Sequence, residues 1–259
     1  MGIFWTPGDG VKPWWVPPPI NMDFNPMMKV DFDKAKVASN QQPPKMNDNK
    51  EDLEAWNQKQ LLHQQIKCWN ADFIKDLPEE QQWAFVNTMS SIQSSMVRLS
   101  NGAWGQNHSI CGAVYGQNQA KIQIISRLLG DEYADKLQTA LDWFFDRTVG
   151  QEQPSKSNPK FFKPISKNNE AFIKFEKPFQ QLGSIKDATV YKQHSKNALE
   201  ELISSVGDEY YYTYKAPVSE NWFNYARFLI NDMDTYFKAL ASHGFKGFFD
   251  YLHEIDITA

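Results

Sequence analysis

The residues of this chain that could do chemistry are few and scattered. The five histidines are His63, His108, His194, His243 and His253. A di-iron centre in a helical bundle needs Glu-x-x-His on two helices, and a zinc protease site needs two histidines one helical turn apart. Neither spacing occurs in the sequence. The sequence therefore predicts no metal, no cofactor and no catalytic residue of these classes.

Nucleophile motifs are missing from the sequence as well. It contains no G-x-S-x-G elbow, no phosphate-binding P-loop and no G-x-G-x-x-G after a predicted strand. His108 stands three residues before Cys111, and a Cys–His pair can generate a thiolate. Chance adjacency is the preferred interpretation, because such pairs usually come from separate segments. The two cysteines are expected to be reduced thiols, buried as small apolar groups.

One predicted helix, from about residue 106 to 129, carries polar residues on its apolar face. Its glycines, among them Gly112 and Gly116, favour close approach of another helix, and a polar network inside the bundle is the second explanation. The candidate interior site consists of Gln117, Asn118 and Cys111. If the protein is instead a ferritin-like enzyme, or the metal-free subunit of an oxygenase-type complex, its pocket is expected here.

The remaining elements predict a mainly α protein. Helices are expected from about 49 to 76, after Pro78, from 131 to 150, from 196 to 206 and after Ser219. An irregular or short-strand excursion is expected around 151–218, with FIKF at 172–175 as the best strand and YYYTY at 210–214 as a short strand or aromatic wall. Gly130 is expected to end one helix and Asp131 to cap the next.

Residues 1–47 differ in composition from the rest, because they hold eight of the fourteen prolines. Proline removes backbone donors and favours extended backbone, so we expect no long helix here. The interleaved apolar residues indicate an arm that docks on its own body or on a neighbouring subunit. The arm's docking residues are predicted to be Phe4, Trp5, Trp14, Trp15, Phe24, Met27 and Met28. The expected domains are this arm and a single helical body, 48–259, with a Phe/Lys-rich insertion at 151–193.

A lysine-rich stretch in that insertion is the only candidate polyanion-binding patch. Its lysines, interleaved with phenylalanines, are Lys156, Lys160, Lys163, Lys167, Lys174 and Lys177. A solvated surface is the simpler interpretation of such a run. Nucleic acid is a possible partner but not the favoured one, since the net charge is −4 and nucleic-acid-binding domains are usually basic.

Composition and motifs together favour a non-enzymatic structural or assembly protein that forms a homo-oligomer or part of a multi-subunit complex. Its apolar runs are too short to span a membrane, and it begins with no recognisable secretory signal, so we expect a cytoplasmic or virion-associated protein. By analogy, the design suits a bacteriophage virion component, such as a connector, portal-associated or internal protein. The alternatives are the ferritin-like enzyme or subunit and a polyanion-binding module using residues 156–177.

Overall fold

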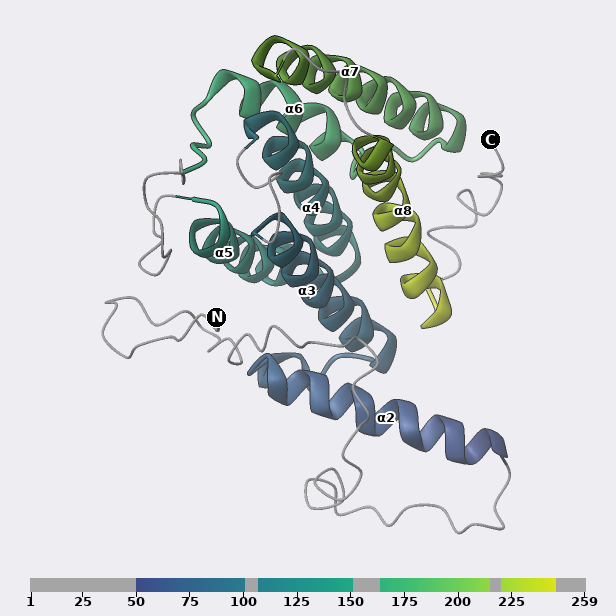
Figure 1. Cartoon of the computed structure of the whole chain (residues 1–259). Coiled ribbons are helices and arrows are strands. Elements are labelled where there is room, and N and C mark those ends of the chain that lie inside the picture. The colour runs from purple at the N-terminus through teal and green to yellow at the C-terminus, as the bar shows by residue number, and fades with distance from the viewer. Residues whose placement is uncertain (1–49, 101–106, 151–163, 215–219, 246–259) are drawn as a thin grey trace, which may run out of the picture. The chain divides into compact units, whose positions relative to one another are not determined.

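A computed structural model describes residues 50–100, 107–150, 164–214 and 220–245. Within these ranges the chain forms seven α-helices and one short 3₁₀ helix, with no strand (Figure 1). They are α2 (Lys50–Cys68), η1 (Asp72–Ile74), α3 (Glu79–Ser100), α4 (His108–Leu129), α5 (Asp131–Thr148), α6 (Glu170–Gln181), α7 (Ala188–Tyr214) and α8 (Glu220–Ser242). The mainly α prediction is confirmed for the described residues. The predicted arm, 1–47, lies outside them.

The chain divides into two compact units, residues 1–86 and 87–259, so that the division falls within α3. In the first unit, α2 ends at Cys68, earlier than the sequence suggested. Asn70 has a φ of 49°. The Asn70 N–H donates to the Lys67 oxygen and the Ala71 N–H to the Ile66 oxygen. This left-handed cap ends the helix and satisfies its last carbonyls.

In the second unit, α4 is the central element, because it packs against α5, α6 and α7 (Figure 1). Its N-cap residue is Asn107, whose side chain accepts a hydrogen bond from the Ile110 N–H at 2.9 Å. Its C-cap residue is Gly130, with a φ of 105°. Only glycine adopts that backbone readily. The stop at Gly130 is confirmed. Asp131, predicted to be a cap, is instead the first helical residue of α5, where its carboxylate accepts a bond from Ser126 at 2.5 Å.

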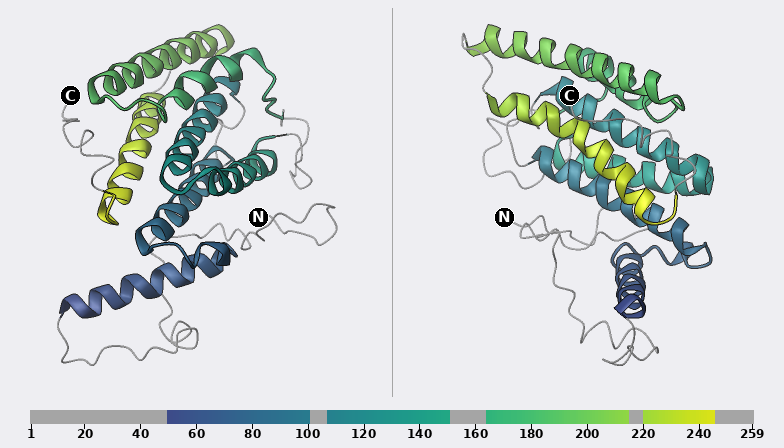
Figure 2. Two further views of the ribbon diagram at one scale, coloured as in Figure 1. Left: turned by 180° about the vertical axis from the view of Figure 1, so that it is seen from behind. Right: turned by 90° about the vertical axis from the view of Figure 1, so that its right-hand side faces the viewer.

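Two segments predicted to be short strands or irregular are helical, so the prediction for the excursion around 151–218 is wrong in them, whereas the helix expected from 196 to 206 lies within α7. FIKF lies inside α6 and YYYTY at the end of α7, which runs alongside α6 (Figure 2). Phe172, Phe175 and Phe179 are buried at spacings of three and four. That spacing lines one face of a helix, whereas a strand would place Phe172 and Phe175 on opposite faces. Residues 151–163 and 215–218 lie outside the described ranges.

The contact between α4 and α6 is made by backbone against backbone. A Cβ atom added to Gly112 would lie 2.3 Å from the Phe172 oxygen, and one added to Gly116 would lie 2.1 Å from the Glu176 oxygen. Beyond α6, a Cβ on Gly183 would lie 2.5 Å from the Ala120 oxygen. Real side-chain carbons do not approach so closely, so only glycine fits. The expectation that the glycines of this helix permit close packing is confirmed at these two positions.

Candidate functional site

Asn118 and Lys121, on successive turns of α4, bring polar groups into the interior of the second unit. The member with the largest desolvation penalty is Lys121, whose side chain is 0% exposed. Its ammonium pairs with Asp232 of α8, donates to the Ser91 hydroxyl of α3 at 2.8 Å, and lies 3.5 Å from the Asn118 carbonyl oxygen. An ammonium has three donors, and here each has an acceptor. We call Lys121, Asp232, Ser91, Asn118 and Ser95 the Lys121 network.

Asn118 joins the network to the backbone. Its amide nitrogen donates to the Ser95 hydroxyl at 2.8 Å and to the Val114 carbonyl at 2.9 Å. Ser95 also contacts the Ser91 and Ile92 carbonyls of its own helix, both at 3.0 Å. The network therefore connects α3, α4 and α8 through bonds that depend on the rotational setting of each helix.

A second polar pair, between Thr88 of α3 and Tyr236 of α8, lies in the same interior. The hydroxyls of Tyr236 and Thr88 are 2.8 Å apart, and the Tyr236 ring lies 5.6 Å from the Lys121 nitrogen. Burial raises the pKa of Tyr236 far above its usual value. Tyr236 is therefore a neutral hydrogen-bonding group that also shields the ammonium from water.

Of the three interior residues predicted from sequence, the structure places one in this network. Asn118 is fully buried there, and Gln117 is also buried, at 2% exposure. Cys111 lies seven residues before Asn118, about 10 Å along the helix axis. Burial raises the pKa of its thiol strongly, so a thiolate nucleophile is disfavoured at this position.

Sequence reasoning identified neither Lys121 nor Asp232 as a site residue. The Asp232 side chain is 16% exposed and paired with Lys121. One signal could have identified the lysine: it is the only Lys, Arg, Asp or Glu between His108 and Ser126. Such a residue, one turn from Asn118 in a stretch of helix with no other charged residue, has to be exposed or to find a buried partner.

A second polar cluster links Lys167, in the segment before α6, to side chains of α4 and α5. Lys167 pairs with Asp142, donates to the Tyr115 hydroxyl at 3.1 Å, and lies 4.6 Å from the centre of the Tyr115 ring. The Tyr115 hydroxyl donates to Asp142, and Gln138 donates to Tyr115 at 2.9 Å. Burial, followed by the bond to Asp142, raises the pKa of Tyr115 and keeps the phenol neutral.

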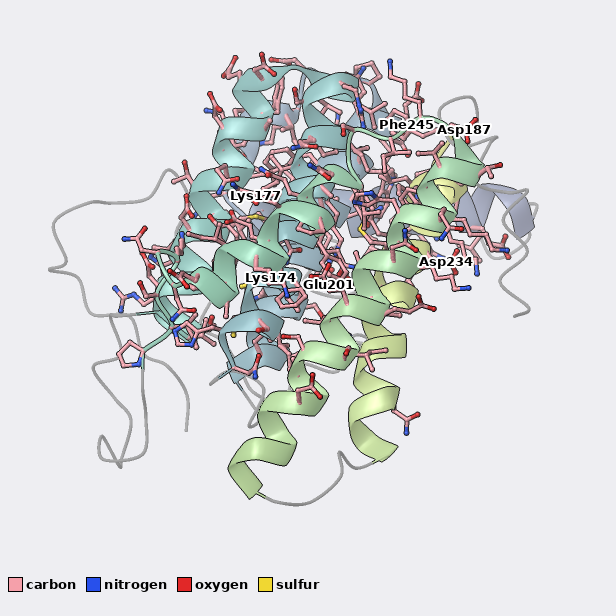
Figure 3. All side chains as sticks on the ribbon, turned by 90° about the horizontal axis from the view of Figure 1, so that it is seen from above. Lys174, Lys177, Asp187, Glu201, Asp234 and Phe245 are labelled. Atoms are coloured by element: carbon pink, nitrogen blue, oxygen red, sulfur yellow. The ribbon has the colours of Figure 1, made fainter. Side chains whose placement is uncertain are left out.

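The lysine patch is partly neutralised in its described half. Lys167 pairs with Asp142, and Lys174 of α6 pairs with Glu201 of α7 at 3.0 Å, as the neighbouring labels in Figure 3 indicate. Lys177 is exposed. Lys156, Lys160 and Lys163 lie outside the described residues, as do all seven predicted docking residues of the arm.

Among the described residues, no group of three or more His, Cys, Asp or Glu side chains is arranged to hold a metal ion. None of the described helices is long and apolar enough to cross a membrane. Comparisons with protein-family models, with curated proteins and with solved structures find no match for this chain.

Proposed function

We propose that this chain is a non-enzymatic structural protein of a larger assembly, in which the 1–47 arm docks on neighbouring subunits. The proposal rests mainly on the Lys121 network, in which no donor of the ammonium is left for a ligand. The ammonium is 0% exposed, and its three donors have acceptors on the protein itself. A catalytic lysine must contact its substrate, whereas a lysine that fixes the register of three helices needs no access to a ligand.

The same network argues against a ferritin-like, metal-bearing bundle. An ammonium at the centre of the interior polar site repels a metal cation, and its one carboxylate neighbour, Asp232, is already paired with it. The polyanion alternative loses support from the pairing of Lys167 and Lys174 with carboxylates. A helical body and an arm rich in aromatic residues remain to be explained, and a subunit of an assembly explains both.

Deletion of the arm tests the proposal directly. We expect the full chain to form a species heavier than 30.0 kDa in size-exclusion chromatography with light scattering, and residues 48–259 alone to have the monomer mass. In the full chain, Trp14→Ala with Trp15→Ala should lower the mass in the same way. Trp143→Ala is the control, since this tryptophan lies on α5 against Arg147. A monomer mass for both chains would contradict the proposal.

A further inference from the structure

One side of α2 carries a row of uncharged side chains that remain accessible. The row consists of Leu53, Asn57, Leu61, Gln64 and Cys68, and its spacings of four, four, three and four residues place all five on one side of the helix. Leu53 is 42% exposed, Gln64 and Cys68 are exposed, and the other two are half-buried. We call these five residues the α2 stripe.

The α2 stripe is separate from the side on which α2 packs. That side uses Leu62 and Ile66, which are both 1% exposed. The helix contains six Lys, Asp and Glu residues, and none of them belongs to the stripe. Cys68, which the sequence predicted to be buried, is exposed there. An accessible row with two leucines and no charge is typical of a contact surface, because charged residues are depleted where proteins meet.

The two amides of the stripe are available as hydrogen-bond donors. Neither the Asn57 nor the Gln64 side chain bonds with a described residue, and the two lie about 10 Å apart along the helix axis. Leucines flank Asn57 on both sides. Such a surface suits a chain with apolar side chains and unpaired backbone carbonyls. A proline-rich segment has this chemistry, because proline has no N–H and extended backbone leaves its carbonyls without internal partners.

The part of this sequence with that composition is 13–28, PWWVPPPINMDFNPMM. It holds five prolines and only one charged residue, Asp23. It also contains five of the seven docking residues predicted for the arm. Other stretches outside the described ranges match less well, since residues 29–48 carry seven charged residues and residues 246–259 carry four.

The chain between this segment and α2 is long enough to reach another copy. Residues 29–49 join the segment to Lys50, and fully extended they span about 70 Å. The helix itself is about 28 Å long. The segment can therefore extend well beyond the α2 of its own chain.

We propose that residues 13–28 of one copy dock on the α2 stripe of a second copy. The tryptophan rings of the segment pack on the stripe leucines, and the stripe amides donate to its proline carbonyls. This inference rests on the proposed assembly function and names the surface that receives the arm. Deletion of 1–47 removes the docking segment, so the body alone stays monomeric although it keeps the stripe.

A change of charge on the stripe tests the interface in the full chain. The stripe variant carries Leu53→Lys with Gln64→Lys, both at exposed positions, and it should fall to the 30.0 kDa monomer mass in sedimentation velocity. The matched control is Val190→Lys with Gln193→Lys on α7, where the valine is 54% exposed and the glutamine is exposed. The control should keep the wild-type mass, and far-UV circular dichroism should be unchanged in both.

Cys68 allows the contact to be trapped, because it is exposed whereas Cys111 is buried. One chain carries Val16→Cys or Asn25→Cys together with Cys68→Ala, and it is mixed with a chain that keeps Cys68. Oxidation with copper–phenanthroline should give a species of twice the 30.0 kDa mass on a non-reducing gel. Tryptic mass spectrometry should find the cysteine at 16 or 25 joined to Cys68. An acceptor chain with Cys68→Ala and Ser204→Cys, exposed on α7, is the control and should not be joined.

The outcomes separate this interface from the assembly function. A wild-type mass for the stripe variant overturns the inference. A chain carrying both Val16→Cys and Cys68 that is joined only within its monomer band overturns it too, because the arm then docks on its own copy. A Cys68–Cys68 crosslink that persists in residues 48–259 would make a second α2 the occupant and would also overturn it. If deletion of 1–47 lowers the mass and the stripe variant does not, the assembly function stands and this interface fails.

Discussion

Lys121 illustrates how a buried charge can specify a structure. Removing an ammonium from water is costly, and its attraction to a carboxylate repays that cost only where the remaining donors are also satisfied. Here Asp232, Ser91 and Asn118 supply the acceptors from three different helices. Rotation of α4 or α8 by one residue would separate the ammonium from Asp232, and rotation of α3 would remove the Ser91 hydroxyl. We therefore interpret the Lys121 network as a device that fixes helix register.

Lys121→Met tests the energetic part of this interpretation. Methionine keeps most of the buried stem but leaves Asp232 without its partner, so we expect the free energy of unfolding to fall by about 3 kcal/mol. Adding Asp232→Leu should recover much of that loss, because it removes the orphaned charge. Urea denaturation measures both effects.

The matched control lies on the same helix as Asp232. Lys238 pairs with Asp234 at 2.6 Å, with the lysine 70% exposed. Lys238→Met should therefore change the free energy of unfolding by less than about 1 kcal/mol. Equal losses at Lys121 and Lys238 would contradict the buried-pair interpretation.

Glu176 gives a pH-dependent prediction at the same scale. Partial burial, and to a smaller extent Asp142, raises the pKa of its carboxyl, although Gln119, Lys167 and Lys177 act in the opposite direction. The folded state therefore holds the proton more tightly than the unfolded state. This contribution to stability is present at low pH and is lost as the pH rises through the raised pKa.

Glu176→Gln should remove that pH dependence. We expect its melting temperature to exceed that of the wild type at about pH 8 and to match it at about pH 4, where Glu176 is protonated. Glu200→Gln, at an exposed position of α7, is the control. A gain at acidic pH that disappears at alkaline pH would show the opposite sign and refute the assignment.

At the scale of elements, the contact between α4 and α6 decides the conformation of a segment that the sequence left ambiguous. FIKF has the composition of a strand, yet it is helical because Phe172, Phe175 and Phe179 then share one buried face. Asn169 starts α6 by accepting a bond from the Ala171 N–H at 2.9 Å. The helix even contains Pro178, which has no N–H to donate to the Lys174 carbonyl, so α6 forms despite the loss of one backbone bond.

Gly116→Ala tests how tightly these two helices pack. Alanine would place its Cβ 2.1 Å from the Glu176 oxygen, so the backbones must separate. We expect a loss of about 3 kcal/mol in the free energy of unfolding, greater than the small gain in helix propensity. Ser94→Ala, at an exposed position of α3, should stay within about 0.5 kcal/mol of the wild type in the same denaturation series. A neutral Gly116→Ala would mean that α4 and α6 are not in backbone contact.

For the whole molecule, the proposed assembly role makes the arm separable from the body. If the arm docks on other copies, the body should not need it in order to fold. We therefore expect residues 48–259 to keep the helical signal of the full chain and, at dilutions where the full chain is monomeric, its melting temperature. A lower melting temperature for 48–259 under those conditions would instead indicate that the arm packs on its own body.

The sequence alone determined the elements that depend on local chemistry. The start of α3 after Pro78, the stop at Gly130 and the glycines of α4 can be recognised from spacing and residue type, because capping and helical periodicity act over a few residues. The tertiary structure decided α6, the helical end of α7 and the pairing of Lys121 with Asp232. Those two residues are 111 positions apart. Packing against distant elements overrides weak local preference and selects which charges meet, and spacing along the chain carries no information about either.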